Sequence, residues 1–191
     1  MSPGTKEILM KIGLLILIAC SLLIGPSAGA AEPTWVMVED PQPVAVPFGP
    51  GERMIFSIDY GVVNAGEGTL EIVGLKEYQD QPCYHIQSRT NSNRFFSSIY
   101  KVRDKIISYI DTEELYSRYF YKRLREGDYK KTVEISFDHP AGLARYANGK
   151  EYAIPHGVHD VLSAFYFVRT LDLKVGEVYH VPAHSSRKSY A

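Results

Sequence analysis

Two histidines and an aspartate stand together at the start of a long apolar segment in the C-terminal half of the chain. They are His156, His159 and Asp160, and His180 and His184 follow further along. Imidazole and carboxylate groups are ligands of zinc, although a zinc site needs a third or fourth ligand that this spacing does not fix. Surface or helix-capping histidines account for the same pattern. The sequence therefore predicts no metal site and no cofactor.

The same segment contains the residue types of a hydrolase without their usual arrangement. Ser163, His159 and Asp160 are neighbours on one predicted helix and cannot form a relay of nucleophile, base and orienting group. No Gly-x-Ser-x-Gly turn is present. Asp160 is suited to cap the helix, and Cys83 is more typical of a buried apolar filler than of a nucleophile. We therefore predict no catalytic residue, and an enzyme is the least favoured interpretation.

Five residues are candidates for binding an anionic or amphiphilic ligand. A hairpin predicted over residues 116–138 interleaves basic and tyrosine side chains, which suits a membrane headgroup region or a lipid phosphate, although nearby acidic residues could neutralise it. A guanidinium inside the apolar segment must meet either a carboxylate, such as Asp59 or Asp104, or an anionic ligand. The candidates are Arg123 and Arg125 in the hairpin, and Phe165, Tyr166 and Arg169 in the apolar segment.

The apolar segment predicts a short helix near residues 159–171. The residues at helical spacing on one face are Val161, Ala164, Phe165, Val168 and Leu171. The remaining surface is largely apolar too, which is typical of a helix that is buried or in a membrane. A helix of about a dozen residues spans roughly 18 Å, and a bilayer needs about 20 residues. We therefore expect the protein's own sheet to enclose this helix.

Most of the remaining chain alternates with the two-residue period of half-buried strands. Turn-forming residues separate these segments, and successive hairpins imply antiparallel pairing. The fold class that we predict is mainly β: a curved antiparallel sheet or half-barrel wrapped around one short apolar helix. The aromatic segment at residues 95–100 has the composition of an exposed loop. The predicted strands cover residues 53–60, 69–73, 83–90, 102–110, 116–125, 129–138, 143–154 and 178–182.

The N-terminal region predicts export. Lysines, an apolar run and small residues up to Ala30 follow one another in residues 1–30, as in a secretory signal peptide. We expect a periplasmic protein, although the residues before Cys20 also resemble a lipidation signal, which would anchor the protein through that cysteine. A Pro-rich leader at 31–51 then precedes a single β domain at 52–191. The net charge of −1 and the absence of nucleic-acid motifs indicate no nucleic-acid partner.

Several short motifs together resemble one family. They are Gly51-Glu52-Arg53, Tyr60-Gly61, Ala65-Gly66 and Gly68-Thr69-Leu70; Phe96-Ser97-Ser98 and Tyr100-Lys101-Val102-Arg103-Asp104; and Lys122-Arg123-Leu124-Arg125-Glu126-Gly127 with Asp160-Val161-Leu162-Ser163-Ala164. Over roughly residues 49–188 the chain resembles the bacterial exported family called domain of unknown function 3108. The resemblance implies an exported antiparallel β domain, curved or barrel-like, with a helix in its mouth; no activity is established for the family. The family pattern usually continues further, so we expect the C-terminal part of the domain to be missing.

Three functions follow as hypotheses. The first is an uncharacterised, non-enzymatic cell-envelope protein that binds a lipid, a lipoprotein or an apolar segment in a cleft between sheet and helix. The second is a structural or assembly partner in the envelope, with possible peripheral membrane contact. The third is a hydrolase. The sequence does not indicate the ligand or the oligomeric state.

Overall fold

Eight strands form one antiparallel sheet in which the spatial order follows the sequence, so that consecutive hairpins build it. The structure is a computed structural model that describes residues 36–190. Among these residues the sheet is not closed into a barrel, and the prediction of a mainly β fold with an antiparallel sheet is confirmed. Its strands are β2 (Arg53–Tyr60), β3 (Val63–Tyr78), β4 (Gln81–Ser92), β5 (Arg103–Asp111), β6 (Ser117–Glu126), β7 (Tyr129–Asp138), β8 (Leu143–Tyr146) and β9 (Glu151–Ala153).

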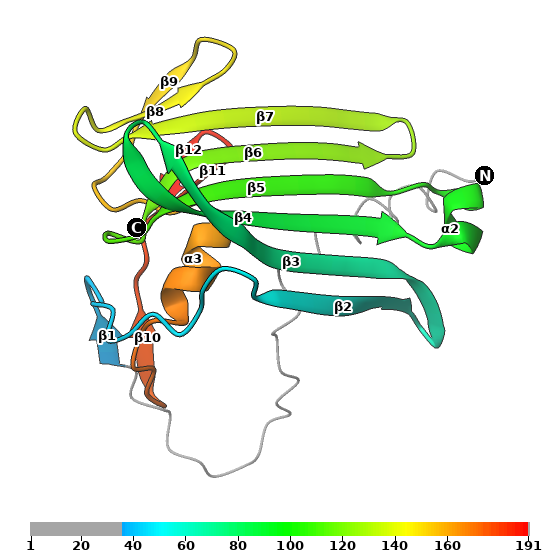
Figure 1. The fold of residues 1–191 in the computed structure, drawn as a ribbon, viewed down its shortest axis with the longest axis horizontal. Helices are drawn as coiled ribbons and strands as arrows, with labels where there is room; N and C mark the ends of the chain where they lie inside the picture. Colours follow the sequence, from blue (N-terminus) through cyan, green and yellow to red (C-terminus); the bar gives the residue numbers. More distant parts are fainter. Residues whose placement is uncertain (1–35, 191) are drawn as a thin grey trace. The chain divides into compact units, whose positions relative to one another are not determined.

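Two small sheets and two helices complete the described part. Strand β1 (Val36–Val38) pairs in parallel with β10 (Glu177–Tyr179), and β11 (Ala183–Ser185) pairs with β12 (Lys188–Tyr190). Helix α3 (Val161–Val168) lies against one face of the large sheet, whereas α2 (Arg94–Ile99) lies at the opposite end of the strands (Figure 1). The signal peptide predicted at 1–30 lies outside the described residues.

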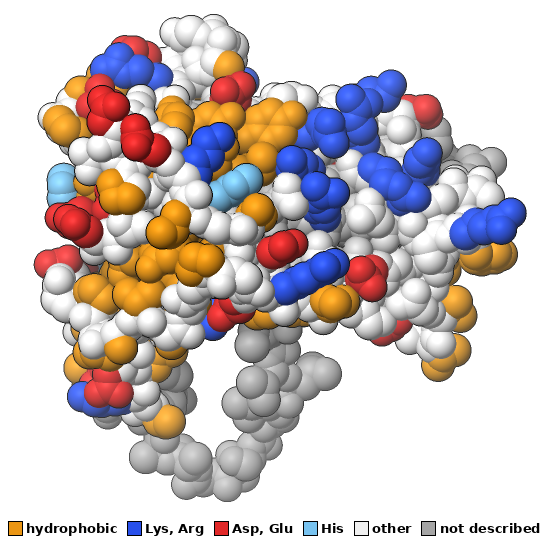
Figure 2. All heavy atoms as spheres, in the orientation of Figure 1, with side chains coloured by type: hydrophobic (Ala, Val, Ile, Leu, Met, Phe, Trp, Pro, Cys, Tyr) orange, Lys and Arg blue, Asp and Glu red, His pale blue; other side chains and the backbone are white. Residues whose placement is uncertain are grey.

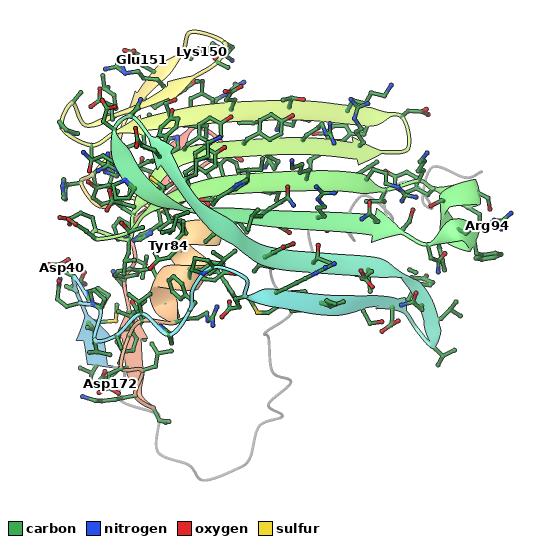
Figure 3. All side chains as sticks on the ribbon, in the orientation of Figure 1. Asp40, Tyr84, Arg94, Lys150, Glu151 and Asp172 are labelled. Atoms are coloured by element: carbon green, nitrogen blue, oxygen red, sulfur yellow. The ribbon has the colours of Figure 1, made fainter. Side chains whose placement is uncertain are left out.

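The position of α3 divides the sheet into two faces and two ends. We call the face toward α3 the inner face and the other the outer face. The proximal end is where α3 lies, and the distal end carries α2, the β2–β3 turn and the β6–β7 turn (Figure 1). At the proximal end, α3 packs on inner-face side chains that are 8% exposed or less, and Tyr84 of β4 lies beside it (Figure 3). These side chains are Leu70, Ile72, Ile86 and Ile110.

Helix α2 and the length of β3 differ from the sequence prediction. Residues 94–99 are helical because the Asn93 side chain accepts a hydrogen bond from the Phe96 amide and caps the first turn. Strand β3 has 16 residues and bends at a bulge between Ile72 and Gly74. The β3–β4 hairpin thereby crosses the outer face toward β7 (Figure 1), where the Tyr78 hydroxyl lies 2.7 Å from Ser136 Oγ. This bent hairpin covers the outer face at the proximal end, with Tyr78 packed against Tyr109 and Tyr119.

The apolar face that helical spacing indicated is buried only in part, with Leu171 buried and Val161 packed against the core. The buried residues are Leu162, Ser163, Tyr166 and Phe167, whereas Phe165 is 44% exposed. The rotation of the helix is fixed by the Asp160 carboxylate, which accepts hydrogen bonds from hydroxyl groups of the sheet. The prediction used apolar spacing alone, and an almost uniformly apolar helix gives that criterion little to distinguish one face from another.

Candidate ligand-binding surfaces

Asp160 attaches the beginning of α3 to two strands of the sheet. Its carboxylate accepts hydrogen bonds from Ser108 Oγ of β5 at 2.6 Å and from Ser117 Oγ of β6 at 2.5 Å. It also accepts from the amides of Leu162 and Ser163, and the Ser163 hydroxyl accepts from the Asp160 amide in return. Burial raises the pKa of Asp160, while these hydrogen bonds act in the opposite direction. Two of the three residues with hydrolase chemistry therefore form a helix cap.

The side chains of the histidines that were weighed as metal ligands have different partners, although the His184 amide donates to the His159 carbonyl. The His159 ring is buried against Phe167, with ring centroids 4.6 Å apart, and burial lowers its pKa to about 4. His184 lies 2.9 Å from the Tyr146 hydroxyl, and His180 lies 3.4 Å from Glu39. Within residues 36–190 no three His, Cys, Asp or Glu side chains are grouped so that they could hold a metal ion.

Cys83 is fully buried in the sheet, as predicted for an apolar filler. Burial raises the pKa of its thiol to about 11, so the reactive thiolate form is disfavoured at neutral pH.

Arg169, at the end of α3, is paired with Glu52, which directly precedes β2. The guanidinium donates to both carboxylate oxygens, at 2.6 and 2.9 Å, and lies over the rings of Phe48 and Tyr166. Hydrogen bonding from Arg169 lowers the pKa of the Glu52 carboxyl. The prediction that Arg169 meets a carboxylate is confirmed, but the expected partners Asp59 and Asp104 were wrong, because Glu52 is brought beside α3 where the leader enters the sheet.

The five predicted ligand-binding residues lie in two different places. Arg169, Tyr166 and Phe165 belong to α3 on the inner side of the sheet, and Tyr166 is completely buried. Arg123 and Arg125 alternate with inner-face residues of β6 and therefore lie on the outer face, at the distal end. The structure does not bring the two sets together, so one ligand in one cleft does not contact all five.

The inner face changes character from its proximal to its distal end. Along β6, Phe120 is buried under the helical segment, whereas Leu124 is partly exposed; along β7, Ile135 is 2% exposed and Val133 partly exposed. On β2, Phe56 is 46% exposed. The partly exposed apolar side chains of this region, which we call the distal inner face, are Phe56, Ile58 and Leu124, and Met54, Ile106 and Val133 border it and pack against the core.

Two glycines form a trough in the distal inner face. A Cβ atom at Gly68 would lie 3.8 Å from side-chain atoms of Phe56 and Ile58, so these two side chains flank a position that has none. A Cβ atom at Gly66 would lie 2.2 Å from the Asn91 carbonyl oxygen, which only glycine allows. A shallow pocket of about 480 Å³ beside these glycines belongs mainly to the outer face, because Ile55, Ser57, Glu67 and Asn91 line it. Sequence reasoning named Gly66 and Gly68 only as part of the family resemblance, although the Gly-x-Gly spacing within a strand was a signal for a close approach at this place.

Polar groups end the distal inner face at β5 and β6. Glu126 is 7% exposed, and burial, followed by the charge of Asp104, raises its pKa to about 7. Burial, followed by the charge of Lys131, lowers the pKa of Lys122, which lies on the same face of β6. The surface thus combines an apolar trough with titratable groups at one side, an arrangement that can contact both parts of an amphiphile.

The comparisons with known proteins give a family and no function. In the described part of the chain no helix is long and apolar enough to cross a membrane. No curated protein and no solved structure matches the chain. The model of a family described as "Protein of unknown function (DUF3108)" matches residues 55–191, in agreement with the resemblance drawn from the sequence. The chain therefore belongs to the DUF3108 family.

Proposed function

We propose that this protein is a non-enzymatic cell-envelope protein that binds the apolar part of a lipid on its distal inner face. The observation that carries the proposal is the change in burial along the inner face. Inner-face side chains that are buried at the proximal end give way, further along the same sheet, to partly exposed apolar side chains on β2, β6 and β7, with two glycines of β3 and the small polar residues Ser88, Thr90 and Ser92 of β4 between them. Exposed apolar patches on a protein surface mark candidate sites for a ligand or a partner.

The shape and composition of this surface favour a lipid over a globular ligand. The trough at Gly66 and Gly68 is flanked by Phe56 and Ile58, so that an extended acyl chain could lie along it. Covering apolar surface contributes about 25 cal/mol for each Å² removed from water. The partly exposed polar side chains at the border, Lys122 among them, suit a headgroup.

Export supports the same proposal. The segment 1–30 has the order of a secretory signal peptide, and a protein released into the periplasm, or anchored through Cys20, would meet lipids and lipoproteins. The sequence predicted a binding cleft between helix and sheet, but the α3 side chains that face the sheet are packed in its core. This proposal therefore places the lipid on the part of the inner face that lies beyond the helix.

The test compares two neighbouring residues of β2 that lie on opposite faces. Native mass spectrometry of gently extracted protein is expected to show a bound lipid, and a fluorescent phospholipid is expected to bind the purified protein. Phe56→Asp should weaken that binding at least tenfold, whereas Ile55→Asp, on the outer face and 61% exposed, should leave it within about twofold. Wild-type protein that emerges without lipid and binds none refutes the proposal.

A second candidate, an assembly partner in the envelope, is favoured by the edge of the sheet. Within the described residues β2 pairs with β3 only, so its other edge presents eight residues of backbone to a partner strand. Photo-crosslinking in cells from position 55 or 57 distinguishes the two. A defined protein adduct that persists after lipid depletion supports the assembly role.

A further inference from the structure

Three cationic side chains lie directly opposite one another on the outer face at the distal end. Arg89 of β4 pairs with Lys105 of β5, and Lys105 pairs with Arg123 of β6. We call these three residues the cation row. Like charges directly opposite each other on neighbouring strands destabilise a sheet. The row therefore opposes folding, and its presence needs an explanation other than stability.

The described residues do not neutralise the row. None of its three side chains forms an ion pair within residues 36–190. Arg89 reaches only the neutral Gln87 side chain, at 3.4 Å, and Arg123 Nε is buried without a hydrogen-bond partner. Of the acidic residues on the outer face, Glu134 accepts from the Tyr119 hydroxyl, and Glu67 and Glu71, which flank the β3 residue opposite Arg89, form no ion pair with the row.

Lys and Arg are concentrated at the distal end in the sequence as a whole. The three stretches that build the distal end, residues 59–67, 89–105 and 122–131, contain ten Lys and Arg against five Asp and Glu, whereas the rest of the chain contains eleven against seventeen. Figure 2 shows Lys and Arg side chains gathered over the distal half of β5 to β7. A nearly neutral protein thus presents one strongly basic end.

Exposed apolar side chains lie at the tips of the same end. Val62, in the β2–β3 turn, is fully exposed, and on α2 Phe95 is 65% and Ile99 56% exposed. Asn93 holds α2 against this turn, because its backbone amide donates to the Ala65 carbonyl oxygen and its side-chain amide donates to the Asn64 carbonyl oxygen. We call Val62, Phe95 and Ile99 the apolar tips. Figure 3 shows Arg94, from the same helix, at this end of the molecule.

We propose that the distal end docks on a membrane surface that contains anionic lipids. The cation row and its basic neighbours contact the lipid phosphates, and the apolar tips enter the boundary between headgroups and acyl chains. A soluble polyanion would be attracted by the cations but would leave the apolar tips in water. A membrane interface provides for both, and it is the occupant that the combination of features favours.

The test is sedimentation of the full exported chain with vesicles. Wild-type protein should bind vesicles of phosphatidylcholine containing phosphatidylglycerol, and added salt or the omission of phosphatidylglycerol should weaken binding. The triple variant Arg89→Gln, Lys105→Gln, Arg123→Gln should bind about a hundredfold more weakly, on the order of fivefold for each of the three charges lost. Its unfolding midpoint should equal or exceed that of wild type, because the repulsion within the row is removed.

The matched control removes the same charge elsewhere. Lys150, Lys174 and Lys188 are exposed and lie outside the distal stretches, and their triple change to Gln should leave vesicle binding within about twofold. Equal binding by the two triple variants, or no binding by wild type, overturns the proposal. The proposal is also overturned if the protein binds heparin as tightly as vesicles and if Val62→Ser and Phe95→Ser leave vesicle binding unchanged, since the row would then be a site for a soluble polyanion.

The docking and the lipid-binding function fail separately. Vesicle binding by a protein that carries no lipid refutes the proposed function and leaves the docking intact. A bound lipid in a protein that ignores vesicles refutes the docking.

Discussion

Replacing Asp160 by alanine should be among the most destabilising single changes in the protein. The carboxylate accepts four hydrogen bonds, two from the hydroxyls of Ser108 and Ser117 and two from amides of the first turn of α3. Loss of a helix cap costs about 1 kcal/mol. Each of the two fully buried hydroxyls, deprived of its acceptor, costs a further 1 to 3 kcal/mol or so.

The expected loss is therefore about 3 to 7 kcal/mol, a large part of the roughly 5 to 15 kcal/mol that stabilises a typical domain. Asp160→Asn should cost less, about 1 to 2 kcal/mol, because its amide oxygen can still cap the helix and its NH₂ group can donate to the serine hydroxyls. Asp172, a 70% exposed carboxylate that also lies near α3 (Figure 3), provides the control, and Asp172→Ala should change stability by less than about 0.5 kcal/mol.

The assay is urea unfolding followed by circular dichroism, with the midpoints compared at equal m-values. A loss below about 1 kcal/mol for Asp160→Ala would refute the reasoning, because it would mean that the position of α3 does not depend on the carboxylate.

Three other predictions concern pH, backbone contact and an ion pair. The pKa of His159 is about 4 in the folded state and 6.5 in the unfolded state, so the unfolded state binds more protons between these pH values, and acidification from pH 6.5 to 4 should lower the free energy of unfolding by about 3 kcal/mol. Urea unfolding at several pH values should show a loss smaller by that amount in His159→Gln, and an unchanged loss when the exposed His156 is replaced. Gly66→Ala, with its Cβ 2.2 Å from a carbonyl oxygen, should lower the thermal midpoint far more than Gly68→Ala, whose nearest contacts are 3.8 Å away; similar midpoints would contradict this. Arg169→Met should cost about 1 kcal/mol in urea unfolding, less at high salt, since its ion pair is partly exposed; a loss independent of salt would attribute it to packing.

The strand pattern was predictable where one face of a strand is buried. The predicted β2 and β7 coincide with the observed strands, because their apolar side chains alternate regularly. The bent half of β3 was missed, because Gly74 and the tyrosine at its end mark a bulge and a fold over the outer face, which are long-range features. Helix α2 was missed because one asparagine cap outweighs its aromatic composition.

The candidate site was less predictable than the fold. The sequence identified Arg123 and Arg125 as basic residues of a hairpin, but Arg89 lies on another strand and joins Arg123 only through the register of three strands. Likewise, Glu52 and Arg169 are 117 positions apart in the chain. Periodicity indicates which side chains share a face of one strand, whereas such pairs depend on register and on how the leader enters the sheet.

The large sheet is covered on both faces at its proximal end, by α3 and the bent β3–β4 hairpin, and by neither at its distal end. Each long strand therefore has one end held by tertiary packing and another held mainly by its hydrogen bonds to neighbouring strands. Amide hydrogens should exchange slowly near Ile110 and faster near Arg103 on the same strand. An occupant of the distal end, a lipid or a membrane, would slow exchange there, so that binding and local order in these strands are thermodynamically linked.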